Sequence, residues 1–186
     1  MVNGTRDCTR YLRSMIGELK CARARVWIGA GLLLAATLPA QTDWVRARLL
    51  EPRSRTAIVH DVARQRVVLF GGYPVPADTW EWDGASWVQR SPAASPPARR
   101  DHAMAYDAAR QRVVLFAGQD NAAGRRGDTW DWDGGTWVQR NPGASPAPRW
   151  SHALTYDAAR QRVILFGGQD NTNTSLADTW EWDGAN

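Results

Sequence analysis

A chain that repeats itself at a fixed spacing must fold into similar units, and this sequence repeats every 50 residues. The segment DTWEWDG at residues 78–84 returns as DTWDWDG at 128–134 and as DTWEWDG at 178–184. Units begin at residues 53, 99 and 148, and the first is shorter and more divergent than the others. Units of this size cannot bury their apolar residues alone, so we expect them to stack on one another.

Each unit contains four short runs with strand character. In the second unit, HAMAY (102–106) alternates in polarity, and RVVLF (112–116) is a β-branched apolar run typical of a strand buried on both faces. DTWDW (128–132) and TWVQR (136–140) flank the turn dipeptide Asp133-Gly134. Four antiparallel strands per unit predict an all-β fold in which each unit forms one propeller blade.

Proline-rich stretches at residues 91–99 and 141–149 follow the first two units. A low-complexity linker between domains is one interpretation of such a composition. Because the stretches recur at the repeat period, we interpret them as connections between successive blades.

The units resemble kelch repeats, as found in galactose oxidase and other kelch-type β-propellers. The resemblance covers residues 53–184 and rests on apolar strands that end in two glycines, VVLFGG and VILFGG, with a tryptophan on the third strand and another on the fourth. The second unit departs from it, with Ala117 at the first glycine position, and tryptophan stands where kelch units often have tyrosine. Repetition assigns a structural role to the glycines and tryptophans at these places: Gly71, Gly72, Trp80, Trp82, Trp87, Gly118, Trp130, Trp132, Trp137, Gly167, Gly168, Trp180 and Trp182.

The turn after the third strand leaves two pairings open. A two-residue turn at Asp83-Gly84 would place Trp80 opposite Trp87, whereas a four-residue loop would place Trp82 there. Either way Trp80 and Trp82 share one face of the strand, and we expect both to pack against the neighbouring blade.

The N-terminal segment TDWVRAR (42–48) resembles the fourth strand of a unit. Residues 41–186 therefore divide into strand d (42–48), blades at 53–90 and 99–140, and a blade at 148–186 that lacks its last strand. Closed propellers typically have about four to eight blades. Two explanations follow: the sequence is a fragment of a longer propeller, or two chains form a head-to-tail homodimer that exchanges this strand.

Residues 1–40 have the features of a signal peptide. Arg23 and Arg25 precede an apolar run at 26–40, which ends in small residues. We expect a signal helix, cleavage near Ala40, a secreted, periplasmic or extracellular protein, and only transient membrane contact. The alternative is an uncleaved anchor, although a spanning helix needs about 20 apolar residues.

Removal of residues 1–40 changes the expected partners. The remaining chain holds 17 Lys and Arg against 17 Asp and Glu, so the sequence pI of about 9.6 belongs to the targeting segment and gives no argument for nucleic acid. Cys8 and Cys21 also leave with that segment, so the mature chain is expected to hold together without disulfides.

Catalytic chemistry finds little support in the sequence. The copper chemistry of the galactose oxidase group requires a cysteine cross-linked to a tyrosine, which the mature chain does not provide. His102 and His152 occupy the same place in successive units, and this favours a structural hydrogen bond over metal ligation. Phosphate-binding loops and nucleophile motifs are also absent from the sequence. We predict no catalytic residue, metal or cofactor.

The units differ most between the second and third strands, at residues 73–77, 119–127 and 169–177. In propellers this loop and the connection between blades emerge on one face, the usual ligand face. Asp120-Asn121 and Asp170-Asn171 suggest turns or a cation site, and we favour turns. The predicted ligand-binding residues are Arg99, Arg100, Asp120, Asn121, Arg125, Arg126, Arg149, Trp150, Asp170 and Asn171.

Arginine and tryptophan around a propeller mouth suit planar anions, acidic sugars or a protein partner, although solvated loops without a ligand are an alternative. The sequence thus predicts a secreted kelch-repeat β-propeller that acts as a non-catalytic binding or protein-interaction module. The other hypotheses are a carbohydrate isomerase or lyase on the same scaffold, and a truncated gene remnant. Convergent non-repeating acid, histidine or tyrosine residues would favour the enzyme.

Overall fold

A computed structural model describes residues 50–74, 77–120, 122 and 124–185. Every described residue belongs to one compact unit, residues 44–186. The predicted signal helix (1–40) and strand d (42–48) lie outside the described residues.

The described residues form an all-β fold with three antiparallel sheets and no helix. The sheets have the strand orders β1-β2-β3-β4, β5-β6-β7-β8 and β11-β10-β9, so each follows the chain as a meander. In chain order the strands are β1 (Ala57–Asp61), β2 (Arg66–Phe70), β3 (Thr79–Trp82), β4 (Trp87–Arg90), β5 (Ala103–Asp107), β6 (Arg112–Gln119), β7 (Arg125–Trp132), β8 (Trp137–Arg140), β9 (Ala153–Asp157), β10 (Arg162–Phe166) and β11 (Thr179–Trp182).

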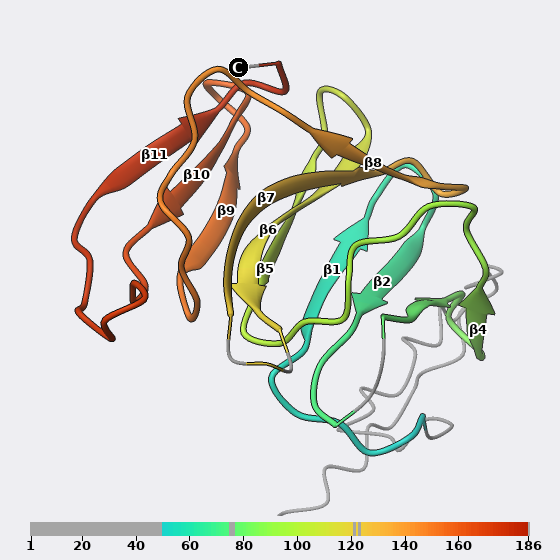
Figure 1. The fold of residues 1–186 in the computed structure, drawn as a ribbon. Coiled ribbons are helices and arrows are strands. Elements are labelled where there is room, and N and C mark those ends of the chain that lie inside the picture. The colour runs from blue at the N-terminus through green and yellow to red at the C-terminus, as the bar shows by residue number, and fades with distance from the viewer. Residues whose placement is uncertain (1–49, 75–76, 121, 123, 186) are drawn as a thin grey trace, which may run out of the picture. The chain divides into compact units, whose positions relative to one another are not determined.

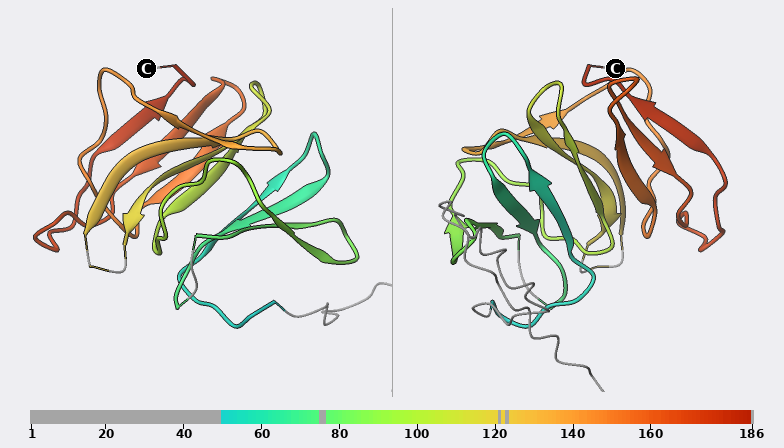
Figure 2. Two further views of the ribbon diagram at one scale, coloured as in Figure 1. Left: turned by 45° about the vertical axis from the view of Figure 1, so that its right-hand side comes forward. Right: turned by 180° about the vertical axis from the view of Figure 1, so that it is seen from behind.

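The second sheet packs against both of the others, through β5 with β1 on one side and β5 with β9 on the other (Figures 1 and 2). Each sheet has the form of a propeller blade. The strands of the second sheet extend further than the sequence predicts, because β6 continues to Gln119 and β7 starts at Arg125. The predicted loop at 119–127 is therefore shorter, and Arg125 and Arg126 belong to a strand.

The turn between the first two strands is built the same way in every sheet. In the second sheet the Asp107 carboxylate accepts a hydrogen bond from the Arg110 backbone N–H (3.1 Å) and pairs with its guanidinium (2.8 Å). Equivalent ion pairs join Arg64 to Asp61 and Arg160 to Asp157. The aspartate and arginine recur in every unit because each pair closes this turn.

The hairpin between the third and fourth strands is a four-residue loop, so Trp82 pairs with Trp87 and Trp132 pairs with Trp137. In the first sheet the Asp83 carboxylate accepts hydrogen bonds from the backbone N–H groups of Ala85 (2.8 Å) and Ser86 (2.7 Å). An aspartate that closes such a loop explains why every unit carries it at this position.

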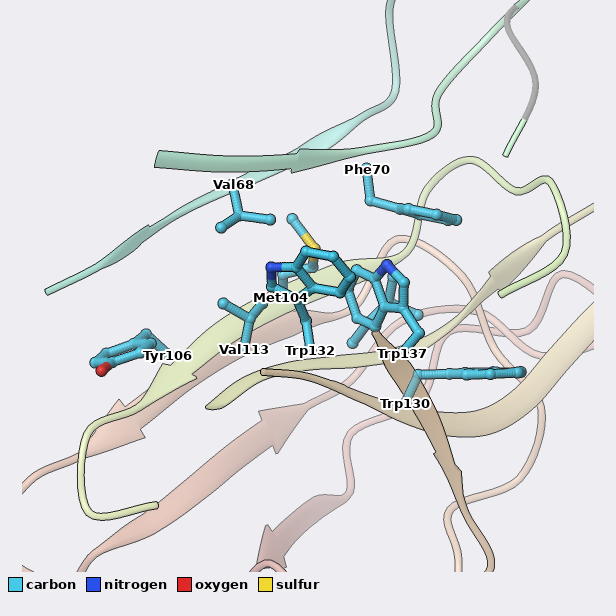
Figure 3. Packing of buried hydrophobic residues seen from close by; sticks show 9 residues of the cluster. Val68, Phe70, Met104, Tyr106, Val113, Trp130, Trp132 and Trp137 are labelled. Carbon is cyan, nitrogen blue, oxygen red and sulfur yellow. The ribbon is translucent and has the colours of Figure 1, made fainter. Parts of the chain in front are cut away.

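The largest apolar cluster lies between the first and second sheets (Figure 3). Trp132 and Trp137 are 0% and 1% exposed and face Val68 and Phe70 of β2. The Trp132 Nε1 donates a hydrogen bond to the buried Glu81 carboxylate at 3.0 Å. The Trp137 Nε1 donates to the Thr79 hydroxyl at 2.9 Å. Both indoles are therefore buried with their polar atoms satisfied by the neighbouring blade.

Smaller clusters join the second and third sheets. Trp182 packs with Val114, and Trp180 packs with Phe116, but both tryptophans are only partly buried. At both contacts between the sheets, the third-strand tryptophan pair of one sheet packs against the other sheet, whereas for Trp80 and Trp82 such packing stays a prediction.

The second glycine position of each unit has a positive φ, with 109° at Gly72 and 103° at Gly118. A Cβ at Gly118 would lie 2.8 Å from the Arg100 carbonyl oxygen, so the next segment of chain leaves no room for a side chain. Ala117 has the same φ of 56° as Gly71, which shows that alanine fits the first position.

Candidate functional site

Arg99 and Arg149 lie in the blade interior and are each 1% exposed. The Arg99 guanidinium donates two hydrogen bonds to the Asp128 carboxylate, at 2.7 and 2.8 Å, and a third to the Ala117 carbonyl at 3.0 Å. Arg149 bonds Asp178 and the Gly167 carbonyl in the same way. These two side chains hold the proline-rich connections against the sheets that follow them. Because they are buried, we do not include them in the binding surface.

These ion pairs also set the titration of their carboxylates. Burial acts to raise the pKa of Asp128, but hydrogen bonds and charge from Arg99 outweigh it and hold the pKa below its usual value. Hydrogen bonds from Arg149 lower the pKa of Asp178 well below its usual range. Both carboxylates therefore stay ionised at neutral pH as the partners of a guanidinium.

The Trp150 ring contacts two arginines from different parts of the chain. The guanidinium carbon of Arg55 lies 5.8 Å from the centre of its ring, and that of Arg125 lies 5.2 Å away. The Arg125 Nη2 also donates to the Asn173 side-chain oxygen at 2.6 Å. Because Arg55 precedes β1, Arg125 begins β7 and Trp150 precedes β9, this stack joins residues from all three sheets.

A second arginine and aromatic contact lies nearby. The Arg100 guanidinium carbon is 5.4 Å from the centre of the Tyr73 ring, and Tyr73 is 51% exposed. Asp101 links the two contacts, because its carboxylate accepts a hydrogen bond from the Arg55 Nε at 3.1 Å and has the Arg100 Nε at 3.9 Å. We call Arg55, Tyr73, Arg100, Asp101, Arg125 and Trp150 the loop-face cluster.

The backbone places the cluster at one end of the blades. The Asp101 N–H donates to the Arg55 carbonyl, and the Ser151 N–H donates to the Asp101 carbonyl, both at 2.9 Å. All three residues have left-handed φ values, from 53° to 58°. A chain of hydrogen bonds thus runs from sheet to sheet just ahead of their first strands, and it fixes the side chains at this position.

The acidic loop residues are engaged in turns. The Asp120 Oδ1 accepts hydrogen bonds from the backbone of Ala122 and Gly124, and its Oδ2 accepts one from Arg126 at 3.2 Å. The Asp170 Oδ1 accepts backbone bonds from Thr172 (2.8 Å) and Thr174 (3.0 Å). In the described part of the chain, no group of three or more His, Cys, Asp or Glu residues is placed to hold a metal ion. Asn171 is exposed, and Asn121 lies outside the described residues.

An open depression of about 500 Å³ adjoins the cluster at Trp150. Its lining includes Ser151, Phe166, Gln169 and Leu176, so it offers both apolar and polar surface next to the indole. A ligand held by the loop-face cluster would have room to extend there.

His102 and His152 pack inside the blades rather than at this surface. Their rings lie edge-on to Phe70 and Phe116, with centroids 5.6 and 5.5 Å apart. Burial, together with the nearby charge of Arg99, lowers the pKa of His102 to about 3, and burial with the charge of Arg149 lowers that of His152 to about 4. Both imidazoles are therefore neutral at physiological pH.

Of the predicted binding residues, the structure brings Arg100, Arg125 and Trp150 together. Sequence reasoning missed Arg55, Tyr73 and Asp101. A signal for two of them was available, because Arg55, Asp101 and Ser151 precede the first strand at equivalent places in the three units and differ in residue type.

No family model matches the chain, and no curated protein matches it. Among solved structures it resembles that of YjhT, a kelch-type propeller protein, with a TM-score of 0.51 and 14% sequence identity. The likeness covers 68% of this chain and 42% of the YjhT chain, so the chain matches less than half the length of that protein. The fold of this chain is β-propeller-like. At this identity the likeness concerns the fold alone. The described residues contain no helix that is long and apolar enough to cross a membrane.

Proposed function

We propose that this chain is a kelch-repeat propeller segment that acts outside the cytoplasm as a non-catalytic binding module, exported by its N-terminal segment. Its ligand is anionic and planar, with the carboxylate of an acidic sugar as the chemistry that fits best. The observation that carries the proposal is that the guanidinium groups of both Arg55 and Arg125 lie close to the Trp150 ring. The β-propeller-like fold supports a scaffold that presents loops for binding.

The charge of the loop-face cluster favours an anion. Its three guanidinium groups are accompanied by one carboxylate, that of Asp101. A guanidinium that stacks on a ring keeps its N–H donors in its own plane, where they can reach the two oxygens of a carboxylate. Tyr73, which is 51% exposed, would pack against the apolar face of a sugar ring.

Binding of sodium glucuronate to the full chain, measured by isothermal titration calorimetry, tests the proposal. Glucose serves as the uncharged control ligand. We expect glucuronate to bind and glucose not to bind, because hydrogen bonds to a charged group are the stronger ones.

The matched variants are Arg100→Ala in the cluster and Arg162→Ala at the opposite end of β10. Loss of a charged hydrogen bond should weaken glucuronate binding about tenfold or more in Arg100→Ala. Arg162→Ala should bind like the original protein. Equal binding of both sugars, or equal weakening in both variants, would refute a carboxylate site at this face.

A further inference from the structure

The loop-face cluster contains buried polar atoms that have no partner in the fold. Among the described residues, the Arg100 Nε, the Asp101 Oδ2 and the Trp150 Nε1 are buried and make no hydrogen bond. Arg99, the neighbour of Arg100 in the sequence, instead bonds the Asp128 carboxylate at 2.7 and 2.8 Å. Because buried polar atoms in folded proteins nearly always have a partner, three unpaired atoms in one cluster point to a ligand that supplies it.

The Asp101 carboxylate uses only one of its two oxygens. Its Oδ1 accepts a hydrogen bond from the Arg55 Nε at 3.1 Å. Its Oδ2 lies 3.9 Å from the Arg100 Nε, which is beyond hydrogen-bond distance. The side chain is only 11% exposed, and an unpaired buried atom of a charged group costs more than one of a neutral group. Asp101 therefore holds one strong acceptor that the fold does not use.

The backbone does not require an acid at this position. Arg55, Asp101 and Ser151 occupy equivalent places in the three units, with φ of 58°, 54° and 53°. The same conformation thus accommodates a basic, an acidic and a hydroxyl side chain. The ion pair with Arg55 does not explain the acid either, because the Arg55 side chain is 42% exposed and such pairs contribute little stability.

We infer that Asp101 determines the specificity of the site, because its Oδ2 accepts a hydrogen bond from a hydroxyl group of the ligand. The site then takes hydroxylated carboxylates, such as uronic acids, and discriminates against carboxylates without hydroxyl groups. This inference rests on the proposed function, in which Arg100 holds the ligand carboxylate.

The arrangement of Arg100 allows the ligand to reach this oxygen. The Arg100 guanidinium contacts the Tyr73 ring, and its Nε is not fixed by a hydrogen bond to a described residue. It can therefore shift toward a ligand carboxylate and open the Asp101 Oδ2 to the adjoining hydroxyl. A carboxylate without a hydroxyl group brings a second negative charge near Asp101 and provides no hydrogen bond to offset the repulsion.

Isothermal titration calorimetry with glucuronate and cyclohexanecarboxylate tests the inference on the full chain. Cyclohexanecarboxylate has a six-membered ring and one carboxylate but no hydroxyl group. Both ligands carry one negative charge, so loss of the Asp101 charge should change both affinities by a similar factor. The ratio of the two affinities therefore reports recognition of the hydroxyl groups. We expect the original protein to bind glucuronate about tenfold or more tightly than cyclohexanecarboxylate.

Two variants of Asp101 should lower this ratio. Asp101→Asn keeps the shape of the side chain and suits the left-handed backbone. It should lower the ratio about fivefold or more, because a neutral amide oxygen is a weaker acceptor than a carboxylate. Asp101→Ser introduces the residue of the third unit and should lower the ratio further. Asp83→Asn is the control, because it removes an exposed charge from the opposite end of β3 and should leave the ratio unchanged.

The other outcomes overturn the inference in different ways. If both affinities rise together in the Asp101 variants and the ratio stays constant, Asp101 only balances charge, and the carboxylate site itself remains. Equal binding of the two ligands to the original protein would show that hydroxyl groups are not recognised there. If neither ligand binds, both this inference and the proposed function are wrong.

Discussion

At the scale of single residues, the two buried histidines have a clear consequence for stability. Both imidazoles lie in the blade interior with pKa values of about 3 and about 4, whereas an unfolded histidine titrates near ~6.5. Between these values the unfolded chain binds more protons than the folded chain. Stability must therefore fall as the pH drops below about 6.5, and the loss continues until the folded histidines are protonated.

The His102→Leu variant tests this pH dependence. Acidification from pH 7.5 to pH 5 should destabilise the original protein by roughly 2 kcal/mol more than the variant, because the variant has lost one of the two groups. Urea unfolding at both pH values measures the difference. His60→Leu is the control, since His60 is exposed. An identical pH dependence in His102→Leu and the original protein would contradict the assignment.

Neighbouring residues can have opposite roles, as Arg99 and Arg100 show. Arg99 is buried against Asp128, whereas the next side chain contacts Tyr73 in the loop-face cluster. The repeat could have distinguished these two roles from the sequence alone, because Arg99 recurs as Arg149 after 50 residues and Arg100 does not recur. The grouping of Arg55 with Trp150 depends on how the sheets stack, which no local pattern in the sequence specifies.

At the scale of the structural elements, the end of the second strand positions the binding surface. β2 ends at Phe70, whereas β6 continues through a bulge between Phe116 and Gly118 to pair with β7 as far as Arg125. The extended pair brings Arg125 to Trp150. The sequence predicted the strands of each blade, but the extension of β6 and β7 depends on pairing across the bulge, and no periodicity in the sequence marks it.

Gly118→Ala should destabilise the protein by about 1–3 kcal/mol, because its φ of 103° and the nearby Arg100 carbonyl exclude a methyl group. Urea unfolding gives the measurement. Gly143→Ala is the matched control, since a Cβ there meets no atom within 4 Å. Equal losses in the two variants would show that the glycine conformation does not matter.

At the scale of the whole molecule, repetition supplies the blades and position in the stack decides burial. Trp82 and Trp132 have the same place in their units, yet Trp132 is fully buried by the first sheet and Trp82 is partly exposed among the described residues. The repeat predicted that these indoles would pack between blades. Which indoles are buried depends on whether another sheet packs against them, and the repeat alone does not specify this.

Urea unfolding of two tryptophan variants, with and without glucuronate, tests most directly whether repeated residues build the blades while non-repeated residues bind. Trp132→Ala should lose about 3–5 kcal/mol under both conditions, because it leaves a cavity in the core. Trp150→Ala should stay within about 1 kcal/mol of the original protein without ligand and gain no stability from glucuronate. A stable Trp132→Ala protein, or a Trp150→Ala protein that glucuronate still stabilises fully, would contradict the account.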